Sequence, residues 1–132
     1  MDNDTPIMEQ LLSVLREKHK NMDNIMVFTK EMEKAIEAND LDSLGAVLTM
    51  RQDAMDKVDK LLAEQKEIIE KIDQPERGKI KLLLEPTDER PAIDDPLEAA
   101  ISDTNRAAFL LLKKIIALDE NINKRMKQGA PE

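Results

Sequence analysis

Apolar side chains recur at alternating spacings of three and four residues in three long segments of the chain. Such spacing places them on one face of an α-helix. In the first segment they are Met8, Leu11, Leu15, Met22, Ile25, Met32 and Ile36. Polar Lys18 and Thr29 interrupt this line. With Thr5 as a starting cap and Asn39 as a left-handed stop, the pattern predicts a helix over about 6–38.

The second segment repeats the pattern and predicts a helix over about 41–73. Its apolar line consists of Leu41, Leu44, Leu48, Met55, Val58, Leu62, Ile69 and Ile72. Arg51 and Gln65 occupy two positions of the line. Because only a few residues separate the first two helices, we expect them to be antiparallel neighbours.

Arg51 has two interpretations, because it stands where an apolar residue is expected. In the first, its long stem covers apolar surface while the guanidinium reaches water, Asp53 or Asp56. In the second, it forms a buried ion pair that fixes the register of the helices.

Residues 73–96 hold four of the six prolines and Gly78, so the pattern predicts a crossover over about 74–95. The apolar island Ile80–Leu84 lies inside it. A crossover of this length without any order would be unusual, so a short extra helix near 79–85 is one interpretation of the island.

The third long helix has the clearest start, and we expect it over about 96–127. Asp95 can cap it, Pro96 suits its first position, and Glu98 can complete a reciprocal capping box. Its apolar line is Leu97, Ile101, Ala108, Leu111, Ile115, Leu118 and Ile122.

The three patterns together predict an all-α protein in which residues 1–132 form a single domain. The expected architecture is an elongated bundle of three long antiparallel helices. The composition agrees, because 36% of the residues are charged and two phenylalanines are the only aromatic residues, whereas strands favour aromatic and β-branched side chains.

A second apolar line in the third helix is the strongest functional signal. Phe109, Leu112 and Ile116 lie beside the main line, and Leu110 adds to the same apolar stretch. This face is wider than a simple bundle requires, so something must cover it. The island at 80–84, a second copy of the chain and a helix of a partner protein are all candidates.

Catalytic and ligand-binding chemistry finds little support in the sequence. There is no cysteine, three glycines cannot build a phosphate-binding loop, and the single histidine, His19, stands among charged residues without an obvious partner. We therefore expect no enzyme activity, no metal site and no cofactor. A net charge of −8 argues against nucleic acid as a partner.

No uncharged apolar run approaches the roughly 18 residues of a membrane-spanning helix. The first residues also lack the basic and apolar regions of a secretion signal. From these observations we expect a cytoplasmic protein without membrane insertion.

Two stretches resemble a known family. Residues 39–61 combine a leucine-rich turn with an Arg-centred second helix, and residues 115–122 form the matching part of the closing helix. Together they resemble the bacterial flagellar export chaperones of the FliT and FlgN type.

The resemblance implies a cytoplasmic chaperone for flagellar type III secretion. Such a chaperone shields the C-terminal amphipathic helix of a filament-cap or hook-junction protein, which is a flagellar axial protein. In that family the C-terminal helices supply much of the client-binding surface, which corresponds here to Phe109, Leu112 and Ile116. The alternative is a structural helical module that forms a homodimer through the same face and has no secreted client.

Overall fold

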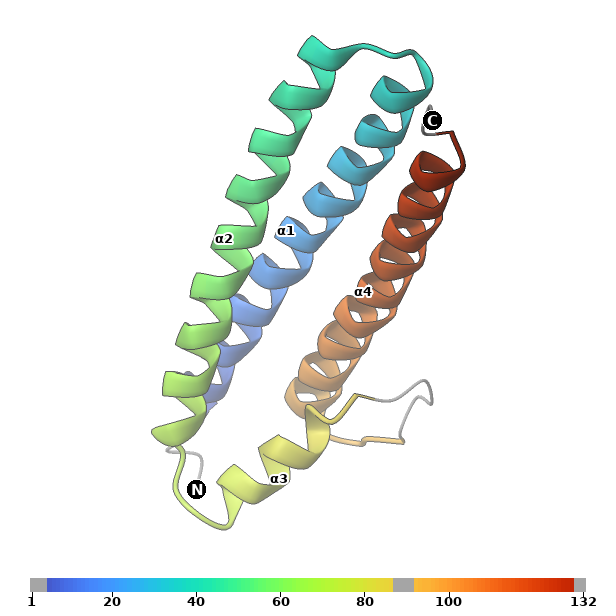
Figure 1. Cartoon of the computed structure of the whole chain (residues 1–132). Helices are drawn as coiled ribbons and strands as arrows, with labels where there is room; N and C mark the ends of the chain where they lie inside the picture. Colours follow the sequence, from blue (N-terminus) through green and yellow to red (C-terminus); the bar gives the residue numbers. More distant parts are fainter. Residues whose placement is uncertain (1–4, 87–91, 130–132) are drawn as a thin grey trace.

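The computed structural model describes residues 5–86 and 92–129, and over these ranges the protein is helical without a strand (Figure 1). The helices are α1 (Thr5–Glu37), α2 (Leu41–Glu70), α3 (Glu76–Leu83) and α4 (Pro96–Gly129). The all-α class is confirmed, and residues 80–83 of the apolar island belong to the short helix α3, with Leu84 as its C-cap. Residues 87–91 of the expected crossover lie outside the described ranges.

The long helices α2 and α4 pack on α1 and not on each other, as far as the chain is described. Figure 1 shows α1 and α2 running in opposite directions, as expected, whereas α4 runs in the same direction as α1. Successive long helices thus alternate in direction, and in such an arrangement the first and the last run parallel. Helix α3 carries the chain across the base of the molecule, from the end of α2 to the start of α4 (Figure 1).

Three apolar clusters follow one another along α1. The largest lies at the base, where Ile80 of α3 is completely buried. Its buried members are Leu11, Leu12, Val14, Leu15, Ile68, Ile69, Ile72, Ile80 and Ile101. The middle cluster is centred on Ile25, Ala54 and Ile115, and the upper one on Met32, Val47 and Ile122. The base is thus the best-sealed part of the molecule.

Helix α2 packs on α1 through only part of the predicted line, of which Ile69 and Ile72 are buried and Leu44 and Val58 pack against the core. The other residues of α2 that face the core recur every seventh position, at Val47, Ala54, Leu61 and Ile68. Four residues of the expected line are exposed instead: Leu41, Leu48, Met55 and Leu62. The expected packing is wrong for these four. Small side chains such as Val47 and Ala54 let α2 approach α1 closely, which turns the larger ones outward.

The turn between α1 and α2 contains the expected stop signal. Asn39 has a φ of 54°, in the left-handed region, and the amide of Asp40 donates to the carbonyl of Ala35 at 2.9 Å, which closes the helix end. The Asp40 carboxylate then caps α2 by accepting from the hydroxyl and the amide of Ser43, and these hydrogen bonds lower the pKa of Asp40.

Replacing Asn39 by Ala is expected to lower the free energy of unfolding by about 1 kcal/mol, because a Cβ branch without a local hydrogen-bonding group disfavours the left-handed conformation. Replacement by Gly relieves the same strain and should change stability by less than about 0.5 kcal/mol. Urea unfolding of the three proteins tests this; equal destabilisation by Ala and Gly would contradict it.

Helix α2 ends at Glu70, three residues before the expected position. The residue before Pro75 is disfavoured in a helix, and the Arg77 side chain donates to the carbonyls of Ile72 and Glu70 at the end of α2. At the start of α4, Asp95 Oδ2 accepts from the Glu98 amide at 2.9 Å and Pro96 is the first helical residue. The Glu98 carboxylate lies 3.1 Å from Lys79 Nζ of α3 and does not complete the capping box.

Candidate partner-binding groove

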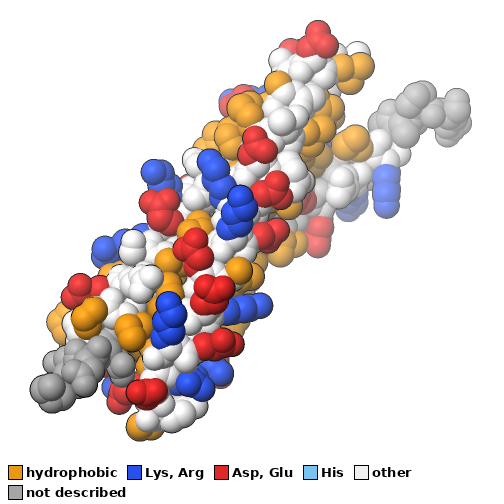
Figure 2. Space-filling view, turned by 90° about the vertical axis from the view of Figure 1, so that its left-hand side faces the viewer, with side chains coloured by type: hydrophobic (Ala, Val, Ile, Leu, Met, Phe, Trp, Pro, Cys, Tyr) orange, Lys and Arg blue, Asp and Glu red, His pale blue; other side chains and the backbone are white. Residues whose placement is uncertain are grey.

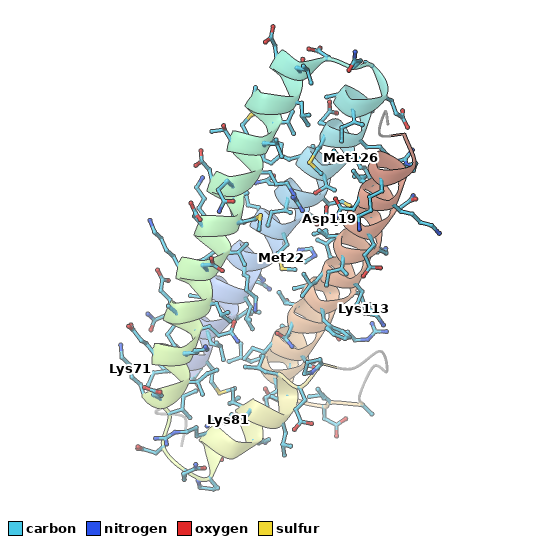
Figure 3. All side chains as sticks on the ribbon, viewed as in Figure 1. Met22, Lys71, Lys81, Lys113, Asp119 and Met126 are labelled. Carbon is cyan, nitrogen blue, oxygen red and sulfur yellow. The ribbon has the colours of Figure 1, made fainter. Side chains whose placement is uncertain are left out.

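A groove of about 530 Å³ lies between α2 and α4, with α1 as its floor. Figure 3 shows Met22 of α1 in the space framed by α2 and α4, and Asp119 on the side of α4 that faces this space. The floor is formed by Lys18, Met22 and Ile25. The α2 wall is formed by Arg51, Met55, Val58, Asp59, Leu62 and Gln65. The α4 wall is formed by Asn105, Ala108, Phe109, Leu112, Ile115, Ile116 and Asp119.

Large apolar side chains on both walls remain open to solvent. Leu112 and Ile116 of α4 are 44% and 47% exposed. Met55 and Leu62 of α2 are 37% and 38% exposed. Each pair is spaced so that its members lie on one face of their helix. The groove therefore presents two facing apolar lines with room between them.

Three of the four residues predicted to bind a partner lie together in this groove. Phe109, Leu112 and Ile116 line the α4 wall, whereas Leu110 is not among the lining residues and is partly buried elsewhere on α4. The ammonium of Lys113 lies 5.4 Å from the centre of the Phe109 ring, a distance that suits a cation–π contact.

The island after α2 covers only the base end of the groove. Leu84 reaches the groove, and its carbonyl accepts from Asn105 Nδ2 at 3.1 Å. Leu82 is 67% exposed and points away from the core. Since Leu112 and Ile116 stay exposed, the island does not provide the intramolecular cover that the sequence left open.

Arg51 links all three long helices at the upper end of the groove. Its Nη2 lies 2.5 Å from Asp119 Oδ2 of α4, and its Nε donates to the buried Thr29 hydroxyl of α1 at 3.1 Å. Arg51 is 16% exposed and Asp119 32% exposed. Asp53 and Asp56, which the first interpretation of Arg51 named, are not its partners, because the paired carboxylate comes from a distant part of the chain.

Lys18 occupies the floor near the lower end. Its ammonium donates to Gln65 Oε1 of α2 at 2.8 Å, and burial lowers the pKa of Lys18. The polar residues that interrupt the apolar lines of α1 and α2 thus form hydrogen bonds with each other, Lys18 with Gln65 and Thr29 with Arg51.

Sequence reasoning missed the α2 wall. A signal was present, because residues 47, 54, 61 and 68 form a second apolar line beside 41, 48, 55 and 62. Two adjacent apolar lines in α2 indicate that one packs in the core and that the other stays on the surface. The same signal identified the candidate partner-binding face of α4.

The surface outside the groove carries charges of both signs. On the face shown in Figure 2, Lys and Arg side chains are mixed with Asp and Glu along the length of the molecule. His19 lies outside the groove, with Nδ1 3.8 Å from Asp23 of the same helix. Among residues 5–86 and 92–129, no cluster of three or more potential metal ligands was found. No helix in these ranges has the length and apolarity needed to cross a membrane.

Comparison with protein-family models, with curated proteins and with solved structures finds no match to this chain.

Proposed function

We propose that this protein is a cytoplasmic chaperone that binds an amphipathic helix of another protein in the groove between α2 and α4. The observation that carries the proposal is the groove itself, whose two walls expose apolar side chains and do not pack on each other. On this reading the three long helices form an elongated bundle in which one helix position is vacant, and the client supplies the missing helix.

A helix suits this groove better than an extended segment. Leu112 and Ile116 on one wall, and Met55 and Leu62 on the other, offer side chains at helical spacing, into which the ridges of a further helix can pack. Met22 and Met55 add flexible apolar surface that adapts to different partners.

The flagellar part of the proposal comes from the resemblance of residues 39–61 and 115–122 to the flagellar export chaperones. On that reading the client helix is the C-terminal helical segment of a flagellar axial protein, held until export. Phe109, Leu112 and Ile116 on the α4 wall then provide part of the client-binding surface.

Co-purification with the tagged protein from its source bacterium tests the flagellar proposal. A flagellar axial protein should be recovered with the unchanged chain and lost with Leu112→Asp. Val27→Asp is the matched control, since Val27 is 54% exposed and lies outside the groove. Recovery of only unrelated proteins would contradict a flagellar client.

Leu112→Asp is expected to weaken client binding about ten- to a hundredfold while the helix content stays unchanged, because it places a charge on an apolar wall that is open to solvent. Leu111→Asp should instead reduce helicity, since Leu111 packs against the middle cluster. Titration with the purified client and circular dichroism measure the two effects. Equal loss of helicity in both variants would mean that Leu112 is core.

Self-association is the second candidate function, because a second copy could cover the same two exposed lines. A homodimer of this kind should bury Phe109 and dissociate in Leu112→Asp. Sedimentation over a range of concentrations separates the two, since a concentration-independent monomer excludes the homodimer.

A further inference from the structure

The groove is bounded by a polar group at each end. At the lower end Lys18 of α1 meets Gln65 of α2, and at the upper end Arg51 of α2 meets Asp119 of α4. Between them the floor and walls are formed mainly by apolar side chains, among them Met22, Met55, Leu112 and Ile116. A ligand that fits the groove must therefore be apolar in the middle and polar at both ends.

The spacing of the two polar ends matches a helix. Lys18 and Thr29, which mark the two ends on α1, are eleven residues apart. At about 1.5 Å per residue they are separated by about 16 Å, or three helical turns. A helix lying along the groove would bring residues eleven positions apart to the two ends, on the same face.

The two ends of the groove differ in whether their charged side chain already has a partner of opposite charge. The Lys18 ammonium has Gln65 as its hydrogen-bond partner, and no carboxylate of the described chain forms an ion pair with it. At the other end, Arg51 is matched by Asp119 Oδ2, whereas Asp119 Oδ1 is buried and receives no hydrogen bond from the described residues. The lower end can therefore accept a negative charge, whereas the upper end already holds a matched ion pair whose second carboxylate oxygen is enclosed by the protein.

From this arrangement we infer the chemistry of the partner helix. It carries an Asp or Glu that pairs with Lys18, a stripe of about three turns of large aliphatic side chains over the groove, and an uncharged polar side chain eleven residues from the acid, beside the ion pair of Arg51 and Asp119. The inference rests on the proposed function and adds the rule by which the groove selects one amphipathic helix among many.

A fatty acid could also place a carboxylate on Lys18 and an acyl chain in the groove. The helix is favoured because the groove is open along its side, where Leu112 and Ile116 are nearly half exposed, whereas lipid sites enclose most of their ligand. The charged Arg51 and Asp119 pair at the far end also suits a polar side chain and not the methyl end of an acyl chain.

Two synthetic peptides test the rule on the full-length protein. Both are helices of about 18 residues, or five turns, with a leucine stripe and a Gln eleven residues from the tested position, which is Glu in one and Lys in the other. Fluorescence anisotropy should show the Glu peptide binding about tenfold or more tightly than the Lys peptide, because opposite charges meet at a partly desolvated site.

Lys18→Glu should reverse the preference, and Lys18→Met, which keeps an apolar stem, should abolish it. Circular dichroism of both variants verifies that they are folded. If the Glu and Lys peptides bind equally well to the unchanged protein, and Leu112→Asp weakens both, the groove binds helices and only the charge rule is overturned. If neither peptide binds, or palmitate alone binds, both the rule and helix binding in this groove are overturned.

Discussion

Replacing Leu15 by Ala is expected to lower the free energy of unfolding by about 2–5 kcal/mol. Leu15 is completely buried in the base cluster, where residues of all four helices meet. Truncation removes apolar contacts and leaves a cavity that this tightly joined region cannot close by shifting one helix. Urea unfolding followed by circular dichroism measures the change.

Leu82→Ala is the matched control, because it removes the same atoms from a side chain that is 67% exposed. It should change the free energy of unfolding by less than about 0.5 kcal/mol. A similar loss in the two variants would contradict the assignment of the base cluster as the main source of stability.

Replacing Arg51 by Ala is expected to destabilise the protein by about 1–3 kcal/mol. The substitution leaves the Asp119 carboxylate partly buried without its cation and deprives the Thr29 hydroxyl of its donor. It also removes the ion pair that connects α2 to α4 across the groove. Thermal unfolding with and without added salt reports the loss.

The double variant Arg51→Met with Asp119→Leu separates the ion pair from the packing of the Arg51 stem. Because both charges are then absent, its stability should return to within about 1 kcal/mol of the unchanged protein. If Arg51→Met alone is as stable as the unchanged protein, the stem carries the effect and the first interpretation of Arg51 is correct.

The helices could be predicted from the sequence because their signals are local. Asn39 and Asp95 mark an end and a start within a few residues of the observed ones, since the left-handed stop and the N-cap depend only on neighbouring residues. The α4 wall could be predicted for a similar reason, because the second line Phe109, Leu112 and Ile116 is visible within one helix.

The packing of α2 and the partner of Arg51 could not be predicted in this way. Helix α2 has two adjacent apolar lines, and the choice between them depends on how closely α1 approaches, which the α2 sequence does not contain. Asp119 is 68 residues from Arg51, and many carboxylates lie nearer along the chain. Only the placement of α4 beside α1 brings these two side chains together.

The position of α3 makes the two ends of the open-sided groove unequal. Helix α3 crosses the base (Figure 1), and Leu84 and Pro86, which follow it, line the groove at that end. Beyond the Arg51 and Asp119 pair, Leu48 of α2 and Met126 of α4 are still exposed, so the apolar path continues toward the turn at Asn39. A bound rod longer than the groove therefore meets α3 at one end and further apolar surface at the other, which makes the two ends of any such ligand unequal.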